Sequence, residues 1–114
     1  METFSSELVL KALDGLTARS IATAQNIANA GTKAYRPVRV SFERALAAAA
    51  GQGVEAVRAV RPMTVADVQS SSGGDLRLDL ELATASSTAL RYAALVEVLN
   101  RQLQLDAIAV TGNG

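Results

Sequence analysis

Apolar residues recur at helical spacing near the start of the chain. From Thr3 onward, one side of the pattern carries Val9, Leu13, Leu16, Ala24 and Ile27. The opposite side is polar apart from small alanines, which is typical of an amphipathic helix. We expect this helix at residues 4–30, with a length of about 37 Å at 1.5 Å per residue.

A second helical pattern occupies the C-terminal part of the chain. Strict alternation over residues 76–82 predicts an extended start, after which the period changes to 3.6. The main apolar stripe then consists of Leu82, Ala85, Ala89, Tyr92, Ala93, Val96, Leu99, Leu103 and Ala107, and further apolar residues lie outside it at Leu90, Leu95, Val98, Leu105 and Ile108. We expect a helix at 79–108, followed by a short tail at 109–114, with more apolar surface than one partner helix can cover.

The residues between the two helices show no sustained period. Residues 38–42 alternate as in a short extended segment, and residues 42–50 have the composition of one short helix. Scattered valines around Pro62 and a Ser/Gly-rich stretch at 69–74 indicate a loosely structured connection over 31–75. The predicted fold class is therefore mainly α: one domain, 1–114, whose two long helices pack antiparallel as a coiled-coil-like pair.

Composition and charge argue against several classes of function. The 11 basic and 11 acidic residues cancel and are scattered, whereas nucleic-acid binding needs a concentrated positive face. The absence of cysteine and histidine removes thiol catalysis, the usual zinc ligands and the commonest general base. Asp75, Asp79 and Glu81 are explained by a helix N-terminus, which favours acidic residues. We expect no enzyme activity, no catalytic or metal site and no cofactor.

The start of the chain also bears on localisation. Glu2 and Glu7 stand where a cleavable secretory signal would have a basic segment followed by an apolar run. We therefore expect no cleaved signal peptide.

The first helix is expected to end in a polar segment, Gln25 to Tyr35. Asn26 and Asn29 are three residues apart and so lie on one face of a helix, and Gly31 occupies the place of a left-handed capping residue. A helix stop alone explains these features. Asn26-Ile27-Ala28-Asn29 followed by Thr32 and Tyr35 also resembles the N-terminal signature of the flagellar axial proteins, the family of rod, hook and hook-associated subunits. The family wording has Thr-Pro-Gly-Tyr where this chain has Thr32-Lys33-Ala34-Tyr35.

Two further segments extend this resemblance. Residues 90–96, Leu-Arg-Tyr-Ala-Ala-Leu-Val, followed by Leu99-Asn100, are similar to a segment that marks the proximal rod subunits of the family. Upstream, Leu78-Asp79-x-Glu81-x-Ala83 fits the same subunits, and Phe42-Glu43 falls where a family Phe-Glu follows the signature. Together these motifs cover roughly half of the chain, in the family's order.

The resemblance implies a structural subunit of the proximal rod of the flagellar basal body, exported by the flagellar type III apparatus and polymerised in the periplasm. Its implied partners are copies of itself, other rod proteins and the membrane ring at the base of the rod. The implied assembly interface comprises Asn26, Ile27, Asn29, Thr32, Tyr35, Leu90, Arg91, Tyr92, Leu95, Leu99 and Asn100. We add Val98 because Leu95 and Val98 lie outside the main stripe and are expected to be exposed in a single chain, whereas Val96 lies on that stripe.

Two alternatives remain at this point. The chain is compatible with another rod or hook subunit, which would differ in its C-terminal motif more than in its physical properties. It is also compatible with a cytoplasmic helical adaptor or export chaperone that forms a closed dimer.

Overall fold

The computed structural model describes residues 3–67 and 78–112. Along the chain, its elements are α1 (Thr3–Ala28), β1 (Val38–Ser41), α2 (Glu43–Ala50), α3 (Val54–Ala59), β2 (Met63–Ala66) and α4 (Leu78–Gly112). The predicted fold class is confirmed, since two long helices at the ends of the chain dominate a mainly helical structure. The linker predicted at 69–74 and the extended start predicted at 76–77 lie outside the described residues.

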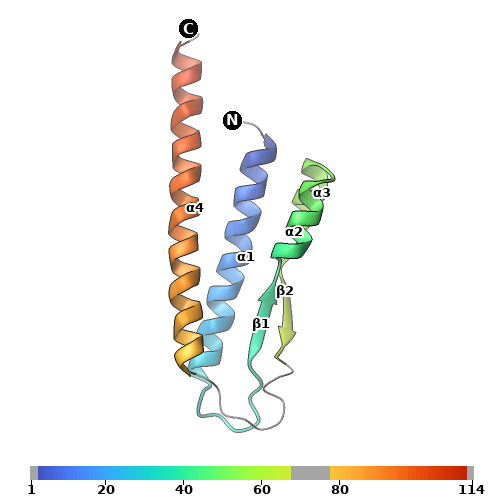
Figure 1. Ribbon diagram of the computed structural model, residues 1–114, viewed down its shortest axis with the longest axis vertical. Helices are drawn as coiled ribbons and strands as arrows, with labels where there is room; N and C mark the ends of the chain where they lie inside the picture. The colour runs from blue at the N-terminus through green and yellow to red at the C-terminus, as the bar shows by residue number, and fades with distance from the viewer. Residues whose placement is uncertain (1–2, 68–77, 113–114) are drawn as a thin grey trace.

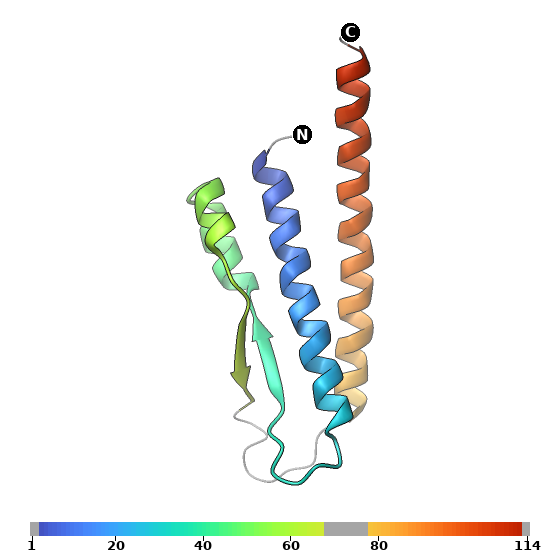
Figure 2. The ribbon, with the colours of Figure 1, turned by 180° about the vertical axis from the view of Figure 1, so that it is seen from behind.

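The elements form three layers with α1 in the middle (Figures 1 and 2). On one side α4 runs antiparallel to α1, and on the other side lie the two short helices and the two strands. The molecule is elongated, with extents of 63 × 26 × 14 Å. At 35 residues α4 is longer than α1 at 26 residues, and the tail expected at 109–114 is helical as far as Gly112.

The face of α4 that is covered differs from the predicted stripe. Its buried and half-buried positions lie on one side of the helix, mostly three or four residues apart, with a gap of seven between Thr88 and Leu95. They are Glu81, Thr84, Ala85, Thr88, Leu95, Val96, Leu99, Gln102 and Asp106, and we call this side the seam of α4. Leu82 and Leu103, both in the predicted stripe, are each 53% exposed. The prediction was rotated by about one residue because it assumed that only apolar side chains are buried, whereas Glu81 and Thr88 lie inside.

Leu95 requires a related correction. It was expected to be exposed in a single chain, but it is half-buried and packs against the hydrophobic core. Val98, at 45% exposed, does lie outside the seam. Leu95 therefore lies in the seam of α4 and Val98 outside it.

The middle of the chain is more ordered than its sequence indicates. The core consists of Leu16, Ala22, Val40, Phe42, Leu46, Ala49 and Val57, so most of it comes from the segment between the long helices. The strands are antiparallel, with Val38 opposite Ala66 and Ser41 opposite Met63. The predicted short helix is present as α2, whereas α3 and β2 were not predicted.

Gly15 lets this middle segment approach α1 closely. A Cβ atom built on Gly15 would lie 2.4 Å from carbons of the Phe42 ring, far inside van der Waals contact. The guanidinium carbon of Arg19 lies 5.0 Å from the centre of the same ring. Phe42 is thus held between a glycine and an arginine on the same face of α1.

Candidate functional site

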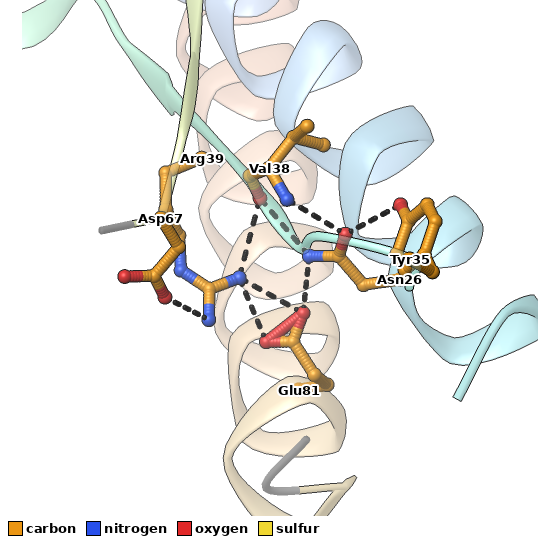
Figure 3. A network of polar contacts seen from close by, with 6 residues as sticks. All are labelled: Asn26, Tyr35, Val38, Arg39, Asp67 and Glu81. Atoms are coloured by element: carbon orange, nitrogen blue, oxygen red, sulfur yellow. Dashed lines mark hydrogen bonds and ion pairs between the residues drawn. The ribbon is translucent and has the colours of Figure 1, made fainter. Parts of the chain in front are cut away.

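A buried asparagine organises the base of the molecule, where α1 ends and α4 begins. Asn26 is fully buried, and its amide makes four hydrogen bonds (Figure 3). Its Nδ2 donates to the Val38 carbonyl at 3.0 Å and to Glu81 Oε1 at 2.5 Å. Its Oδ1 accepts from the Tyr35 hydroxyl and from the Val38 N–H, each at 2.9 Å. The two donors and both lone pairs of the amide are therefore used.

Glu81 is the second centre of this network. Only 2% of Glu81 is exposed, and besides Asn26 it binds Arg39, whose Nη1 lies 3.0 Å from Oε1 and 2.9 Å from Oε2. Nη2 of Arg39 lies 2.9 Å from Asp67 Oδ2. A buried carboxylate is tolerated only when it is paired and hydrogen-bonded, and Arg39 supplies the charge while keeping part of its side chain in water.

We call the set Asn26, Tyr35, Val38, Arg39, Asp67 and Glu81 the polar clamp. It joins the end of α1, the turn after it, β1, the residue that follows β2, and the first turn of α4 (Figure 3). The clamp therefore fixes both long helices and the sheet relative to one another at one end of the molecule.

The turn after α1 carries Tyr35 back to Asn26. Asn29 Nδ2 donates to the Gln25 carbonyl at 2.9 Å, and the Tyr35 N–H donates to the Thr32 carbonyl at 3.3 Å. Ala34 has a φ of 66°, at the place where the axial-protein signature has glycine. The left-handed residue is thus Ala34 and not Gly31, whose φ is not in the left-handed region, because α1 ends in tight turns and reverses later than the sequence predicted.

A second polar link lies further along the helix pair. Arg19 binds Glu43 through two bonds of 2.6 and 2.7 Å and also donates to the Val40 carbonyl at 2.8 Å. Arg91 Nη1 approaches Glu43 at 3.8 Å from α4. The hydrogen bond from Arg19 lowers the pKa of the Glu43 carboxyl to about 2, so the group is ionised at neutral pH.

The residues assigned to an assembly interface are distributed over several environments. Asn26 and Tyr35 lie in the polar clamp, Asn29 and Thr32 lie in the turn, and Arg91 lies beside Glu43. Half-buried positions are Ile27, Leu95 and Leu99, and exposed positions are Leu90, Arg91, Tyr92, Val98 and Asn100. The motif residues near the end of α1 are therefore used within the chain, while several on α4 face outward.

Sequence reasoning missed Arg39, and it explained the charge of Glu81 by a helix N-terminus without predicting its burial. Arg39 reads as one polar position of an alternating strand, and its ion pairs connect it to residues far along the chain. Glu81 carried a signal, since it is part of the segment that resembles the rod subunits. The resemblance was therefore the feature of the sequence that pointed to Asn26 and Glu81.

Comparison with known proteins adds no relative. A scan against protein-family models finds no match to this chain, and a search of curated proteins finds no significant similarity. In residues 3–67 and 78–112, no three acidic side chains gather so that they could hold a metal ion. Over the same ranges, no helix is long and apolar enough to span a membrane. The fold and the polar clamp define an elongated helical protein whose α4 exposes several apolar side chains.

Proposed function

We propose that this chain is a structural subunit of the bacterial flagellar basal-body rod, of the FlgB type that belongs to the proximal rod. One observation carries the proposal. The residues that resemble the axial signature, Asn26 and Tyr35, meet Glu81 from the other resembling segment in a single buried network. A resemblance found at two ends of a chain gains weight when its residues contact each other.

The apolar surface of α4 supports an assembly role. Its exposed apolar residues are Leu78, Leu80, Leu82, Leu90, Tyr92, Val98, Leu103, Leu105, Ile108 and Val110. So many exposed apolar side chains on one helix favour contact with other proteins, since large exposed apolar patches mark such contacts in soluble proteins. Subunits that use it head to tail, with a rotation that does not close, build a helical tube.

In this role the protein transmits torque and turns over no substrate. The polar clamp and the Arg19–Glu43 link make each subunit stiff by fixing α4 to α1 and to the middle segment. The subunit is exported through the flagellar type III apparatus and assembles in the periplasm. Its neighbours are its own copies, other rod proteins and the membrane ring at the base of the rod.

Deletion of the gene in the bacterium that encodes it tests the proposal. We expect cells without flagellar rods that do not swim, and recovery of both rods and swimming when the gene is returned on a plasmid. Deleted cells that swim normally and assemble complete basal bodies would exclude the role.

The same exposed surface on α4 is compatible with a cytoplasmic adaptor or export chaperone that forms a closed dimer. Sedimentation of the purified chain separates the two functions. A compact dimer that does not change with concentration favours the adaptor. A monomer that passes into large, open-ended species as concentration rises favours the rod subunit.

A further inference from the structure

An apolar groove runs along one side of the helix pair. It is formed by α1, α2 and α4, has a volume of about 500 Å³, and is lined by apolar residues that include Leu8, Ala12, Leu46, Ala47, Ala94 and Leu95. Several of these are alanines, so a helix can approach the floor of the groove closely. The charged residues at its edge are Glu43 and Arg91, which lie 3.8 Å apart and offset each other.

The C-terminal end of α4 is also apolar, and it is exposed. Because the helices are antiparallel and Asn26 contacts Glu81, the start of α1 at Thr3 is level with about residue 104. Residues 105–112, which we call the terminal extension, thus continue for about 12 Å past the described part of α1 (Figure 1). In it Leu105 is 59%, Ile108 64% and Val110 75% exposed, and Asp106 is its single charged residue.

The extension cannot enter the groove of its own chain. Ala94 and Leu95 of α4 form one wall of that groove, and α4 continues from there as one uninterrupted helix to Gly112. The two surfaces match in being apolar and nearly uncharged, but they can meet only between different copies.

We propose that the terminal extension of one subunit docks in the groove between α1, α2 and α4 of the next. This inference rests on the proposed function and names the contact through which that function is carried out. The two contacting surfaces are different, so the interface is heterologous and leaves a free groove and a free extension at opposite ends of every chain of subunits. Growth can then continue at an end, as a rod requires.

Site-directed disulfide formation tests the contact, since the chain has no cysteine of its own. Ala47→Cys marks the groove and Ile108→Cys marks the extension, and both positions are exposed in the single chain. The two single variants, one of them carrying a mass tag, are mixed at a concentration at which the chain assembles and are then oxidised. We expect the mixed disulfide dimer in several-fold excess over both same-variant dimers. A chain that carries both substitutions should give a ladder of multimers.

Ala48→Cys is the matched control, because Ala48 is the exposed neighbour of Ala47 on α2 but does not line the groove. It should yield mixed dimers only in the proportion expected from random pairing. Circular dichroism of each variant should match the parent chain, which shows that the fold is retained.

The contrary results are distinct from one another. Ile108→Cys dimers in excess would mean that extensions pair with each other, and equal yields from Ala47→Cys and Ala48→Cys would mean that the groove is not occupied. Either result overturns the docking inference. If electron microscopy shows assembled tubes without the mixed disulfide, the docking inference fails while the rod function stands. If basal bodies do not contain the chain, the rod function fails separately.

Discussion

At the residue scale, the side chain of Asn26 makes hydrogen bonds that join several parts of the chain. It pairs the N–H and the carbonyl of Val38 as a neighbouring strand would, and it also binds the Tyr35 hydroxyl and the Glu81 carboxylate. Each of these groups is removed from water when the chain folds. A buried polar group without a partner costs more than a hydrogen bond gains, so the stability of the site depends on every partner being present.

Asn26→Ala should therefore lower the free energy of unfolding by about 3 kcal/mol, because four polar partners lose their contacts at once. Asn29→Ala is the control, since within the described residues the Asn29 side chain bonds only to Gln25 and Thr32, three or four residues away, and the loss of stability should stay below about 1 kcal/mol. Urea unfolding followed by circular dichroism measures both. Equal losses for the two variants would show that the clamp does not stabilise the fold.

Ala34 offers a gain in stability at the same site. Its φ of 66° is unfavourable for a residue with a Cβ atom, and glycine relieves that strain while adding freedom to the unfolded chain. We expect Ala34→Gly to raise the free energy of unfolding by about 0.5 kcal/mol, the net of these two effects.

Ala30→Gly serves as the comparison, because Ala30 lies in the same turn region without a left-handed φ. It should lower the free energy of unfolding by about 0.5 kcal/mol. If both glycines destabilise the protein alike, the turn does not require a left-handed residue at position 34.

At the scale of elements, α1 packs against other elements on two sides, and this packing determines which residues it can carry. Gly15 is a weak residue for a helix interior, yet the Phe42 ring occupies the space that a side chain would fill. Gly15→Ala gains about 1 kcal/mol of helix propensity and loses about 1–3 kcal/mol by overpacking.

We expect the loss to exceed the gain, so that Gly15→Ala lowers the melting temperature. A second variant isolates the cause: Phe42→Leu should cost less in the Gly15→Ala chain than in the parent, because the smaller side chain relieves the clash. An increase in melting temperature for Gly15→Ala alone would show that the ring does not limit this position.

The elements differ in how far the sequence could predict them. α1, α2 and α4 were predicted because helical period or composition is a local signal. α3 has six residues and the four residues of β2 are all exposed, so neither carries such a signal, and β2 exists through its register with β1. The seam of α4 was misplaced because apolar residues surround the helix. Its true position depends on the polar partners of Glu81, which come from other elements.

The polar clamp was predictable in part. The resemblance singled out Asn26 and Tyr35 together as interface residues, and within the chain the Tyr35 hydroxyl donates to Asn26 Oδ1. Arg39 could not be found in this way, because its partners Asp67 and Glu81 lie 28 and 42 residues further along the chain. Only the folded arrangement brings the three charges together.

At the scale of the whole molecule, the outer side of α4 is the surface with no partner within the described chain. Val98 belongs to it at 45% exposed, whereas Leu95, three residues earlier, packs against the core. Val98 can therefore be changed without disturbing the core, whereas Leu95 cannot. Val98→Asp should leave helicity and melting unchanged and prevent large species from forming, because a charge buried without a partner at an interface costs several kcal/mol.

Leu95→Asp should instead lower the free energy of unfolding of the single chain by about 3 kcal/mol, since it places a charge in a packed position. Circular dichroism and sedimentation distinguish the two effects. Assembly of Val98→Asp at the parent's concentration would show that this side of α4 is not an interface.

The most direct test of the central claim is to locate the chain in purified basal bodies. Cells that carry a tagged copy in place of the gene, and that still swim, provide the sample, and electron microscopy with a label against the tag gives the position. We predict label on the rod near the membrane ring, and none on basal-body remnants from cells that cannot build a rod. Basal bodies with intact rods but without the chain, while the tagged protein remains in the cytoplasm as a compact dimer, would contradict the assignment.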